Sequence, residues 1–425
     1  MRSLSALLRR AELALTGPLP ESVRAAARIE LVGAMLYGAF FAGSLGFLPV
    51  VLRRLGATTD QLALYVTFTY VGQLLSPLSI TLMRRRAPLR FATACWVAAR
   101  GSLVLAAVIA DATWLLALVG VFWVVEMLPA PAYARVMEQI YPLRYRGRAM
   151  AGVRVGMTLV VLVATPLAGA LLDQVGPRVL LPAAAVFGVL AALVFARVNV
   201  EGAEKPVSAE RAAPAEPAPT ASVATAPSDS RSAPSPLSAI SALWRNRPFG
   251  LYLAGLTVYG FGGVMALPLY PVVQVSRLGL SYTQIGYLGL AQSLMWLVGF
   301  LYWGRLLDRR GPVWVLRLSM GLAALVPLTY VFAGSAWALL PAFLVQGLIQ
   351  GGFELGVTNT GIALAERGRV MEYTALQTAV VGLRGMLAPF LGTLLLALGA
   401  PDTAVFALSV ALIAGGWILL GRVRA

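Results

Sequence analysis

Apolar runs that are each long enough to cross a lipid bilayer dominate this sequence. With 59% of its 425 residues hydrophobic and only 12% charged, the chain could not hide this surface in one water-soluble core. A membrane-spanning helix needs about 20 mostly apolar residues, and the strands of a membrane barrel would alternate apolar and polar residues, which runs such as LVLAAVIA at 103–110 do not. We therefore expect an all-α membrane protein with twelve transmembrane helices, over residues 29–52, 60–82, 90–110, 112–140, 150–172, 178–197, 248–272, 282–307, 312–334, 336–365, 371–399 and 401–421.

The basic residues indicate how these helices are oriented. The net charge is +16, and most of the 34 lysines and arginines lie in loops on the side that both termini share. Only Arg53, Arg54, Arg178 and Arg277 fall on the opposite side. Because basic loops stay in the cytoplasm, we expect both termini to be cytoplasmic, in a bacterial inner membrane. Membrane topology thus explains the charge, and we expect no nucleic-acid partner.

Two residue types that build metal and redox sites are scarce. The chain has no histidine, and its single cysteine, Cys95, lies within an apolar run. This excludes disulfide frameworks and Cys/His metal sites. No phosphate-binding loop of the form GxxxxGK(S/T) appears either. We expect no metal, no cofactor and no enzymatic activity, with energy drawn from an ion gradient rather than from ATP bound to this chain.

A linker divides the chain into two six-helix halves. Residues 198–247 contain the stretch APAEPAPTASVATAPSDSRSAPSP, which cannot bury enough apolar surface to fold. We expect this linker to be cytoplasmic and largely disordered, between an N-terminal half at 29–197 and a C-terminal half at 248–421. Residues 1–28 are expected to form a cytoplasmic tail, either disordered or folded as an amphipathic helix, and 422–425 a short cytoplasmic C-terminus. The face of that helix would consist of Leu4, Leu7, Leu8 and Ala11.

The two halves are repeats of each other. At a nearly constant spacing, Tyr37-Gly38 and Pro49 correspond to Tyr259-Gly260 and Pro271, Leu55-Gly56 to Leu278-Gly279, Gln61 to Gln284, Arg146 to Arg369, and Pro166 with Gly169 to Pro389 with Gly392. Two similar halves are typical of transporters whose substrate site lies near the midplane between them. Spans 1 and 7 carry YGAFFAGSLGFLP and YGFGGVMALPLYP. Their glycines and prolines favour either local bending or close helix packing.

Three segments give the chain a specific resemblance to a known family. GRLLDRRGP at 304–312, PLRYRGRAMAG at 142–152 and ERGRVMEY at 366–373 resemble the loop signature and the span starts of the major facilitator superfamily. The resemblance covers the chain except for the N-terminal tail and the linker. It implies that family's fold of two pseudo-symmetric six-helix halves, and a monomeric transporter that works by alternating access. It also implies that spans 1, 4, 7 and 10 line a central cavity.

The loops after spans 2 and 8 are expected to form a cytoplasmic gate. The phrase LMRRRAP at 82–88 recurs as LLDRRGP at 306–312, and in the family such loops help to close the inner gate. A carboxylate there can accept hydrogen bonds at the N-terminus of a helix in the other half. Asp308 can do so at the start of span 5, whereas Arg84 cannot at the start of span 11. The gate candidates are Gly304, Asp308, Arg309, Arg310, Arg84, Arg135 and Glu138, with Glu138 or Glu372 as partners of the arginines. The alternative is that Arg84 to Arg86 serve only topology.

Charged residues inside the spans are the candidates for proton coupling, because burying charge in a membrane is unfavourable. Glu126, Glu354, Arg100 and Arg384 lie deepest. We expect Glu354 to be the coupling acid, with Arg384 as its partner in one state of the cycle. Glu126 with Arg100 is the competing pair. For Glu354 and Arg384, a permanent ion pair that only ties helices together is the alternative.

A polar stripe on span 10 marks the expected substrate cavity. Gln346, Gln350, Glu354 and Thr358 recur every four residues and so lie along one helix face, although polar residues can also serve helix packing. Trp123, Glu126, Ala130 and Tyr133 form a comparable face on span 4. The cavity candidates are Tyr37, Phe40, Trp123, Tyr133, Tyr259, Gln292, Trp296, Gln346, Gln350 and Thr358.

These features predict a proton-coupled secondary transporter that exports a small amphipathic compound, with the substrate, protons and the lipid bilayer as its partners. A largely apolar pocket with few polar contacts suits such a compound. ATPLAGALLD at 164–173 partly resembles the family's antiporter motif, although Thr165 and Ala170 replace expected glycines. One alternative is a proton-coupled importer of a sugar or another polar metabolite, favoured by Gln292, Gln346, Gln350 and Gln377. The other is a membrane sensor that has kept the fold.

Overall fold

The first half of the chain consists of consecutive helices. A computed structural model describes residues 21–76, 78–83, 87–141, 143–198, 246–366 and 369–423. The predicted N-terminal amphipathic helix and nearly all of the predicted linker therefore lie outside the described residues. The helices of the first half are α2 (Glu21–Phe40), η1 (Phe41–Leu45), α3 (Leu48–Arg54), α4 (Thr59–Leu75), α5 (Leu78–Leu82), α6 (Pro88–Ser102), η3 (Leu103–Ala107), α7 (Ala112–Met127), α8 (Ala130–Ile140), α9 (Leu143–Val175) and α10 (Pro177–Phe195).

The second half repeats this order and completes a fold of twelve spans. Its helices are α13 (Arg247–Met265), α14 (Leu269–Val272), η4 (Val273–Arg277), α15 (Tyr282–Arg310), α16 (Pro312–Ala323), α17 (Leu325–Phe332), η5 (Trp337–Leu339), α18 (Leu340–Leu364), α19 (Val370–Ala397) and α20 (Asp402–Leu420). Within the described residues, 11 helices are long and apolar enough to cross a membrane. The remaining predicted span, the second, is α4 followed by α5. The twelve predicted spans thus each coincide with a helix or a short series of helices.

Spans 1 and 7 are both interrupted near the same point of the repeat. In span 1 the α-helix gives way to the wider π-helix η1 and a turn at Gly46 and Phe47, before α3 begins with Pro49 in its first turn. In span 7 the break lies at Ala266 to Pro268, and α14 passes into a second π-helix, η4. Proline cannot continue an interior helical hydrogen-bond ladder. Both helices are therefore interrupted here, and their glycines also pack closely: a Cβ on Gly43 would lie 2.9 Å from the Ala184 Cβ, and one on Gly262 would lie 2.7 Å from the Ser409 carbonyl oxygen.

Glycines with positive φ close corresponding turns in the two halves. Gly56 has φ +92° and Gly279 has φ +59°, and they occupy equivalent turns after spans 1 and 7. Gly176 and Gly399, with φ of +77° and +87°, do the same after spans 5 and 11. A side chain would be strained at this backbone conformation. The matched glycines show that the repeat seen in the sequence is a structural repeat.

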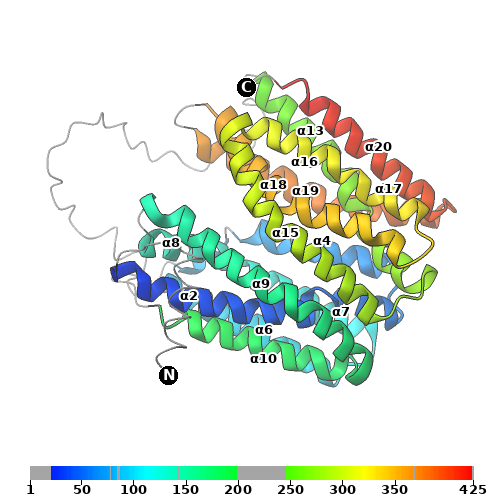
Figure 1. Ribbon diagram of the computed structural model, residues 1–425, viewed down its shortest axis with the longest axis horizontal. Coiled ribbons are helices and arrows are strands. Elements are labelled where there is room, and N and C mark those ends of the chain that lie inside the picture. Colours follow the sequence, from blue (N-terminus) through cyan, green and yellow to red (C-terminus); the bar gives the residue numbers. More distant parts are fainter. Residues whose placement is uncertain are drawn as a thin grey trace.

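The two halves lie side by side, and long helices run along their boundary (Figure 1). Helix α9 of the first half packs antiparallel to α15 of the second, and their backbones approach closely. A Cβ on Gly169 would lie 2.5 Å from the Tyr282 carbonyl oxygen, and one on Gly286 would lie 3.1 Å from the Pro166 Cα. On the other side of the boundary, Thr67 of α4 donates to the Met386 carbonyl of α19 over 3.3 Å.

The apolar core is shared at one end of the molecule and divided at the other. We call the end that carries residues 53–59 and 276–281 the Arg54 end, and the opposite end the Asp308 end. One cluster of buried apolar residues reaches across both halves toward the Arg54 end, and includes Phe47, Leu62, Met265 and Tyr282. Toward the Asp308 end the described residues form separate clusters, one around Val136 in the first half and another in the second half. The halves are thus joined at the Arg54 end.

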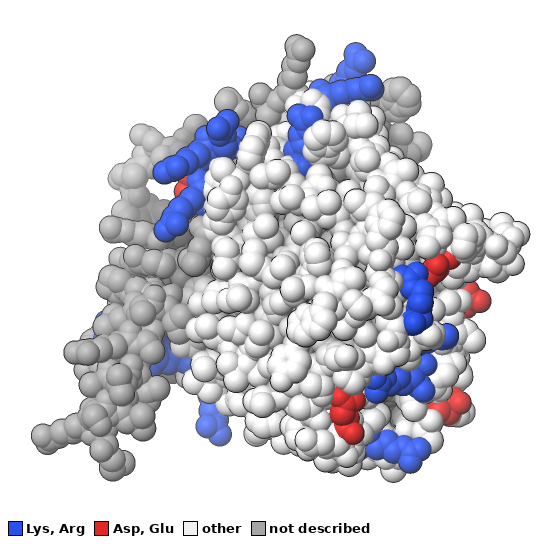
Figure 2. Space-filling model, turned by 45° about the vertical axis from the view of Figure 1, so that its right-hand side comes forward, with Lys and Arg blue, Asp and Glu red and all other residues white. Residues whose placement is uncertain are grey.

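Charged side chains keep to the margins of the face drawn in Figure 2, and its broad middle is free of them. Large apolar side chains are exposed over the molecule instead, among them Val108, Trp114, Phe332 and Trp337. A water-soluble protein rarely exposes so wide an apolar surface. In a bilayer this surface meets lipid tails, and the charged margins meet the headgroups and water.

Candidate functional site

A cavity of about 340 Å³ lies between the two halves. Aromatic and amide side chains line it, among them Phe41, Tyr65, Tyr270, Gln292, Trp296 and Gln346. Within the described part of the chain, no Asp, Glu, Lys or Arg lines it. Apolar walls with a few orienting polar groups are the usual character of a small-molecule site. The cavity is therefore the first part of the candidate functional site.

Four of the predicted cavity residues line this cavity, namely Gln292, Trp296, Gln346 and Gln350. The Trp296 indole packs against Phe300 with ring centroids 5.8 Å apart. Its Nε1–H is buried and has no hydrogen-bond acceptor. Buried donors are rarely left unpaired, so this N–H is a group to which a bound compound could supply the missing acceptor.

The other predicted cavity residues lie outside this cavity. Tyr37 and Phe40 pack together inside the first half, with ring centroids 5.7 Å apart, because only the part of span 1 from Phe41 onward reaches the cavity. Trp123 packs against Phe122 and Tyr259 against Phe353, each with centroids 5.2 Å apart. Thr358 is exposed, two turns beyond Gln350 on α18. Tyr133 belongs to a polar cluster around Glu30.

A buried ion pair joins Arg100 of α6 to Glu126 of α7. Arg100 Nη2 donates to Glu126 Oε1 over 2.7 Å, and Nε lies 3.2 Å from both carboxylate oxygens. The two side chains are 7% and 4% exposed. Nη1 also donates to the Gly188 carbonyl over 3.2 Å, and the guanidinium lies 4.7 Å from the Tyr37 ring centroid. The pair proposed from the sequence as an alternative is therefore formed, with both charges compensated inside the first half.

Glu30 is a buried carboxylate that the sequence analysis missed. It lies on α2, is 4% exposed, and accepts hydrogen bonds from the hydroxyls of Tyr133, over 2.9 Å, and Tyr141. Tyr133 belongs to α8, so this cluster ties span 1 to span 4 near the Asp308 end. The signal in the sequence was present, since Glu30 stands at the start of the first apolar run and acids within spans are functional candidates.

Glu354 and Arg384, the predicted coupling pair, are apart in this structure. Glu354 is exposed on α18, one turn beyond the cavity-lining Gln350. Arg384 is 6% exposed and lies on α19 against α13, where its Nη1 donates to the Leu256 carbonyl over 2.8 Å. Glu354 and Arg384 are predicted to pair in only one state of the transport cycle, and the structure described here is a different state.

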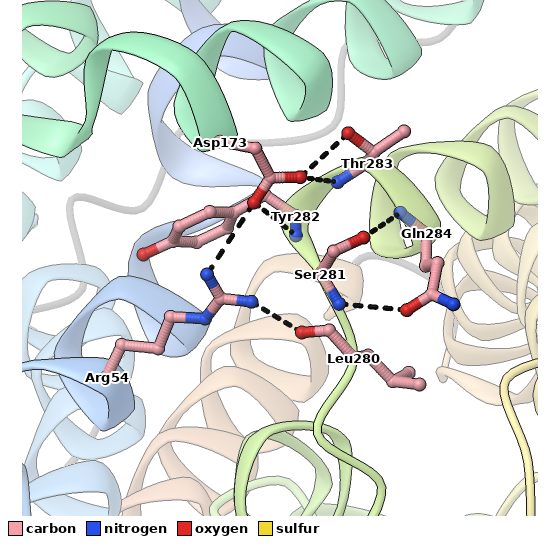
Figure 3. Close-up of polar contacts among 7 residues, drawn as sticks. All are labelled: Arg54, Asp173, Leu280, Ser281, Tyr282, Thr283 and Gln284. Carbon is pink, nitrogen blue, oxygen red and sulfur yellow. Dashed lines mark hydrogen bonds and ion pairs between the residues drawn. The ribbon is translucent and has the colours of Figure 1, made fainter.

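A polar cluster at the Arg54 end joins the two halves (Figure 3). Asp173, near the end of α9, accepts hydrogen bonds from the backbone N–H of Tyr282, over 3.1 Å, and of Thr283, over 2.8 Å, at the first turn of α15. The Thr283 hydroxyl donates to the same carboxylate over 2.7 Å. A helix N-terminus carries unpaired N–H groups and a partial positive charge, so it favours an anion. We call this cluster, together with Arg54, the latch.

Arginines complete the latch from the end of α3. Arg54 donates to the Leu280 carbonyl, its Nη1 lies 3.7 Å from Asp173, and its guanidinium lies 3.7 Å from the Tyr282 ring centroid. Arg53 donates to the Ser276 hydroxyl over 2.9 Å. These contacts all cross between the halves, except that of Arg54 with Asp173. They tie the two halves together at the Arg54 end.

The sequence carries one signal for the latch, the pair of repeat partners Gln61 and Gln284. Both glutamines have the same structural role in the two halves. Each caps its own helix in a capping box, with Thr58 before α4 and with Ser281 before α15. Such boxes mark helix N-termini. The sequence therefore locates the α15 N-terminus, but not the carboxylate of α9 that binds it.

The predicted gate residues lie at the Asp308 end. Asp308, Arg309 and Arg310 are exposed and Gly304 is half-buried, with the Arg310 guanidinium 5.6 Å from the Trp314 ring centroid. Arg135 is half-buried and Glu138 is exposed, both on α8. Arg84 lies outside the described residues. Glu372, proposed as an arginine partner, binds Arg369, and this hydrogen bond raises the pKa of Arg369.

Replacing Asp173 with Asn should open the Arg54 end. Asn keeps the size of the side chain but removes the charge at the α15 N-terminus and the attraction to Arg54. For a partly exposed site we expect a loss of about 1–2 kcal/mol, or about 5- to 30-fold in the ratio of closed to open molecules. Distances between spin labels at the exposed residues Ala110 and Gly334, on a Cys95→Ala background, would measure this.

Asp402→Asn is the matched control for this prediction. Asp402 lies at the same end and pairs with Arg277 over 2.7 Å, but both residues belong to the second half. Its loss should leave the spin-label distances unchanged. Equal distance distributions in Asp173→Asn and in the parent protein would show that the latch does not hold this end closed.

The arrangement of two similar six-helix halves around a shared cavity has a counterpart among known protein families. The model of the Major Facilitator Superfamily matches residues 31–282 and 253–425. The chain belongs to the major facilitator superfamily. Both halves of this superfamily member are matched, so the family predicted from the three segments and from the repeat is confirmed. Comparison with curated protein sequences finds no match.

Solved structures of transporters share the fold. A mutant of the nucleoside transporter NupG aligns with a TM-score of 0.71 at 9% identity, covering 94% of this chain and 100% of that one. NupG itself gives 0.66 at 10% identity, with 95% and 98% covered. A bacterial homologue of the human lysosomal transporter Spinster, in an inward-facing and unoccupied conformation, gives 0.60 at 14% identity, with 94% and 95% covered. This superfamily member therefore has the fold of a secondary transporter.

Proposed function

We propose that this protein exports a small amphipathic compound in exchange for protons by alternating access. The observation that carries the proposal is the cavity, which lies between the halves and is lined by aromatic rings and amides without a charged side chain among the described residues. Such walls bind an apolar or aromatic body and orient it through a few hydrogen bonds. The location between two repeats suits a site that is exposed to each side in turn.

The proposed orientation of the protein in the membrane follows from the distribution of its basic residues. The Asp308 end carries the arginine-rich loops, so it faces the cytoplasm, and the Arg54 end faces outward. Cysteines introduced one at a time on a Cys95→Ala background test this orientation. A cysteine at Gly334 should react with a membrane-impermeant maleimide in intact cells, whereas one at Asp308 should react only after the cells are opened. Labelling of position 308 from outside would reverse the orientation.

The antiparallel helices α9 and α15 supply a switch between a state closed at the Arg54 end and a state closed at the Asp308 end. Asp173 near the end of α9 binds the N-terminus of α15, and Asp308 near the end of α15 lies at the same end of the molecule as the N-terminus of α9. Each carboxylate can therefore close one end by binding the N-terminus of the partner helix. In the state described here the outer contact is made. In the alternate state, the Asp308 contact would form and the latch would open.

Glu354 is the proposed coupling acid. It is exposed, follows the cavity-lining Gln346 and Gln350 along one face of α18, and forms no ion pair among the described residues. A proton from the Asp308 end could therefore reach it directly. Glu126 is the alternative, but Arg100 already compensates its charge.

Import of a polar metabolite is the second candidate. Gln292, Gln346 and Gln350 place three amides on the cavity wall, and each amide can both donate and accept hydrogen bonds. The structural similarity to a nucleoside transporter adds some weight to a substrate with several polar groups.

Transport in proteoliposomes separates these functions. A compound that stabilises the purified protein against heat would be offered to vesicles with an imposed pH gradient. Exchange for protons predicts accumulation when the vesicle interior is acidic, whereas co-transport with protons predicts accumulation when the exterior is acidic. Accumulation that is the same with either gradient, and without one, would exclude proton coupling.

A further inference from the structure

Arg384 is a buried cation without a carboxylate partner. The residue is 6% exposed, its Nη1 donates to the Leu256 carbonyl over 2.8 Å, and the phenol of Tyr70 is its other hydrogen-bond partner. Its Nε–H is buried and has no acceptor. No carboxylate binds it within the described part of the chain. Arg100, the comparable arginine of the first half, is fully compensated by Glu126. A buried charge without a counter-charge is strongly unfavourable, so Arg384 requires an explanation that Arg100 does not.

The Arg384 guanidinium occupies a space between α19 and α13, near the boundary of the two halves. A Cβ on Gly260 would lie 1.6 Å from Arg384 Nη1, so only glycine leaves space for the guanidinium against α13. Tyr259 and Tyr70 are the phenols beside it, and Tyr70 belongs to α4 of the first half. Arg384 thus lies at the boundary between the two halves.

The Arg384 guanidinium lies next to the cavity between the halves. Val66 of α4 lines the cavity, and Tyr70 follows one helical turn later. Gln350 of α18 also lines it, and Phe353, which stacks on Tyr259, follows within the next turn. A helical turn advances about 5.4 Å. A compound held in the cavity could therefore reach Arg384 with one end.

We propose that Arg384 binds an acidic group, such as a carboxylate, on the transported compound. This rests on the proposed transport function and names the substrate class as amphipathic organic acids. The aromatic or apolar body occupies the uncharged cavity, and the acidic group supplies the counter-charge that Arg384 lacks. Arginine suits this role because its fork of N–H donors can bind a carboxylate through two parallel hydrogen bonds.

The test uses two probes of the same shape and different charge. 2-Naphthoate carries the carboxylate, and 2-naphthamide replaces it with a neutral amide. Binding of each to the full-length protein in nanodiscs is measured by calorimetry. The wild-type protein should bind the acid about tenfold or more tightly than the amide. In Arg384→Gln the two affinities should come within about twofold of each other.

Two further variants guard against a folding artefact. Gly260→Ala leaves Arg384 in place but forces its guanidinium to move, and it should also lose the preference for the acid. Arg317→Gln is the matched control: it removes an arginine of the same half whose Nε also lacks an acceptor but which packs on Trp417, 4.9 Å from the ring centroid. This control should keep the tenfold preference.

The proposal fails if the wild-type protein shows no preference for the acid, or if Arg384→Gln and Gly260→Ala both keep it. Either result leaves the proposed transport function standing, because that function is judged by accumulation in proteoliposomes. Conversely, a preference that depends on Arg384 would identify an anion site even if no gradient drives transport.

Discussion

Arg100→Gln is expected to destabilise the protein by about 3–5 kcal/mol, the usual effect of leaving one member of a buried ion pair alone. Glu126 would keep a side chain that is 4% exposed and lose all three of its short contacts with the guanidinium. The contact of Arg100 with the Gly188 carbonyl, which ties α6 to α10, would be lost as well. In a thermal unfolding scan at fixed rate, we expect a fall in the midpoint of about 5–10 °C.

The double variant Arg100→Met with Glu126→Met separates the charge from the packing. Apolar residues of similar volume often replace a buried ion pair with little loss, so the double variant should unfold nearer to the wild-type temperature than the single one does. Arg178→Gln, an exposed arginine at the Arg54 end, is the control and should change stability by less than about 0.5 kcal/mol. A single variant that is as stable as this control would mean that the pair contributes nothing to folding.

Glu354→Gln is expected to abolish gradient-driven accumulation while leaving exchange of substrate between equilibrated compartments intact. Glutamine has the shape and neutrality of the protonated acid, so the variant should bind substrate and change conformation but carry no proton. Accumulation under a pH gradient should fall at least about tenfold, to the level of empty vesicles, as expected when the group that carries the proton is removed.

Glu126→Gln is the comparison that decides between the two acids. If Glu126 is only a structural partner of Arg100, its replacement should lower stability without uncoupling transport from the pH gradient. Retained accumulation in Glu354→Gln together with lost accumulation in Glu126→Gln would assign the coupling role to Glu126. Measuring exchange in both variants separates uncoupling from a general loss of function, since only a folded and mobile protein can exchange substrate.

The latch and the Asp308 loop illustrate how a repeated sequence produces an asymmetric mechanism. Asp173 has no acidic counterpart in the second half, where the corresponding helix α19 ends in LLLA. Asp308 likewise has Arg84 as its counterpart. Both acids therefore belong to the pair α9 and α15, one near the C-terminal end of each helix. The other pair, α4 and α19, packs through Thr67, Tyr70 and Gly385 instead.

The sequence by itself determined the twelve spans, the two halves and the family. These properties are local or repetitive: the length of an apolar run decides whether a helix crosses the bilayer, and corresponding residues such as Gly56 and Gly279 need only be compared along the chain. The cavity-facing part of span 10 was also predictable, because Gln346 and Gln350 share a face by helical periodicity alone and both line the cavity.

Only the tertiary structure decided which charged groups meet and which face each helix turns toward its neighbours. Periodicity gives the residues on one face, but the rotation of a helix about its axis is fixed by packing against other helices, so Tyr37 and Phe40 lie inside the first half rather than in the cavity. For the same reason Arg100 meets Glu126, while Arg384 meets the Leu256 carbonyl and the Tyr70 phenol but no carboxylate. Asp173 acquires its role because α9 packs antiparallel to α15, which brings its carboxylate to a helix N-terminus more than a hundred residues away in sequence.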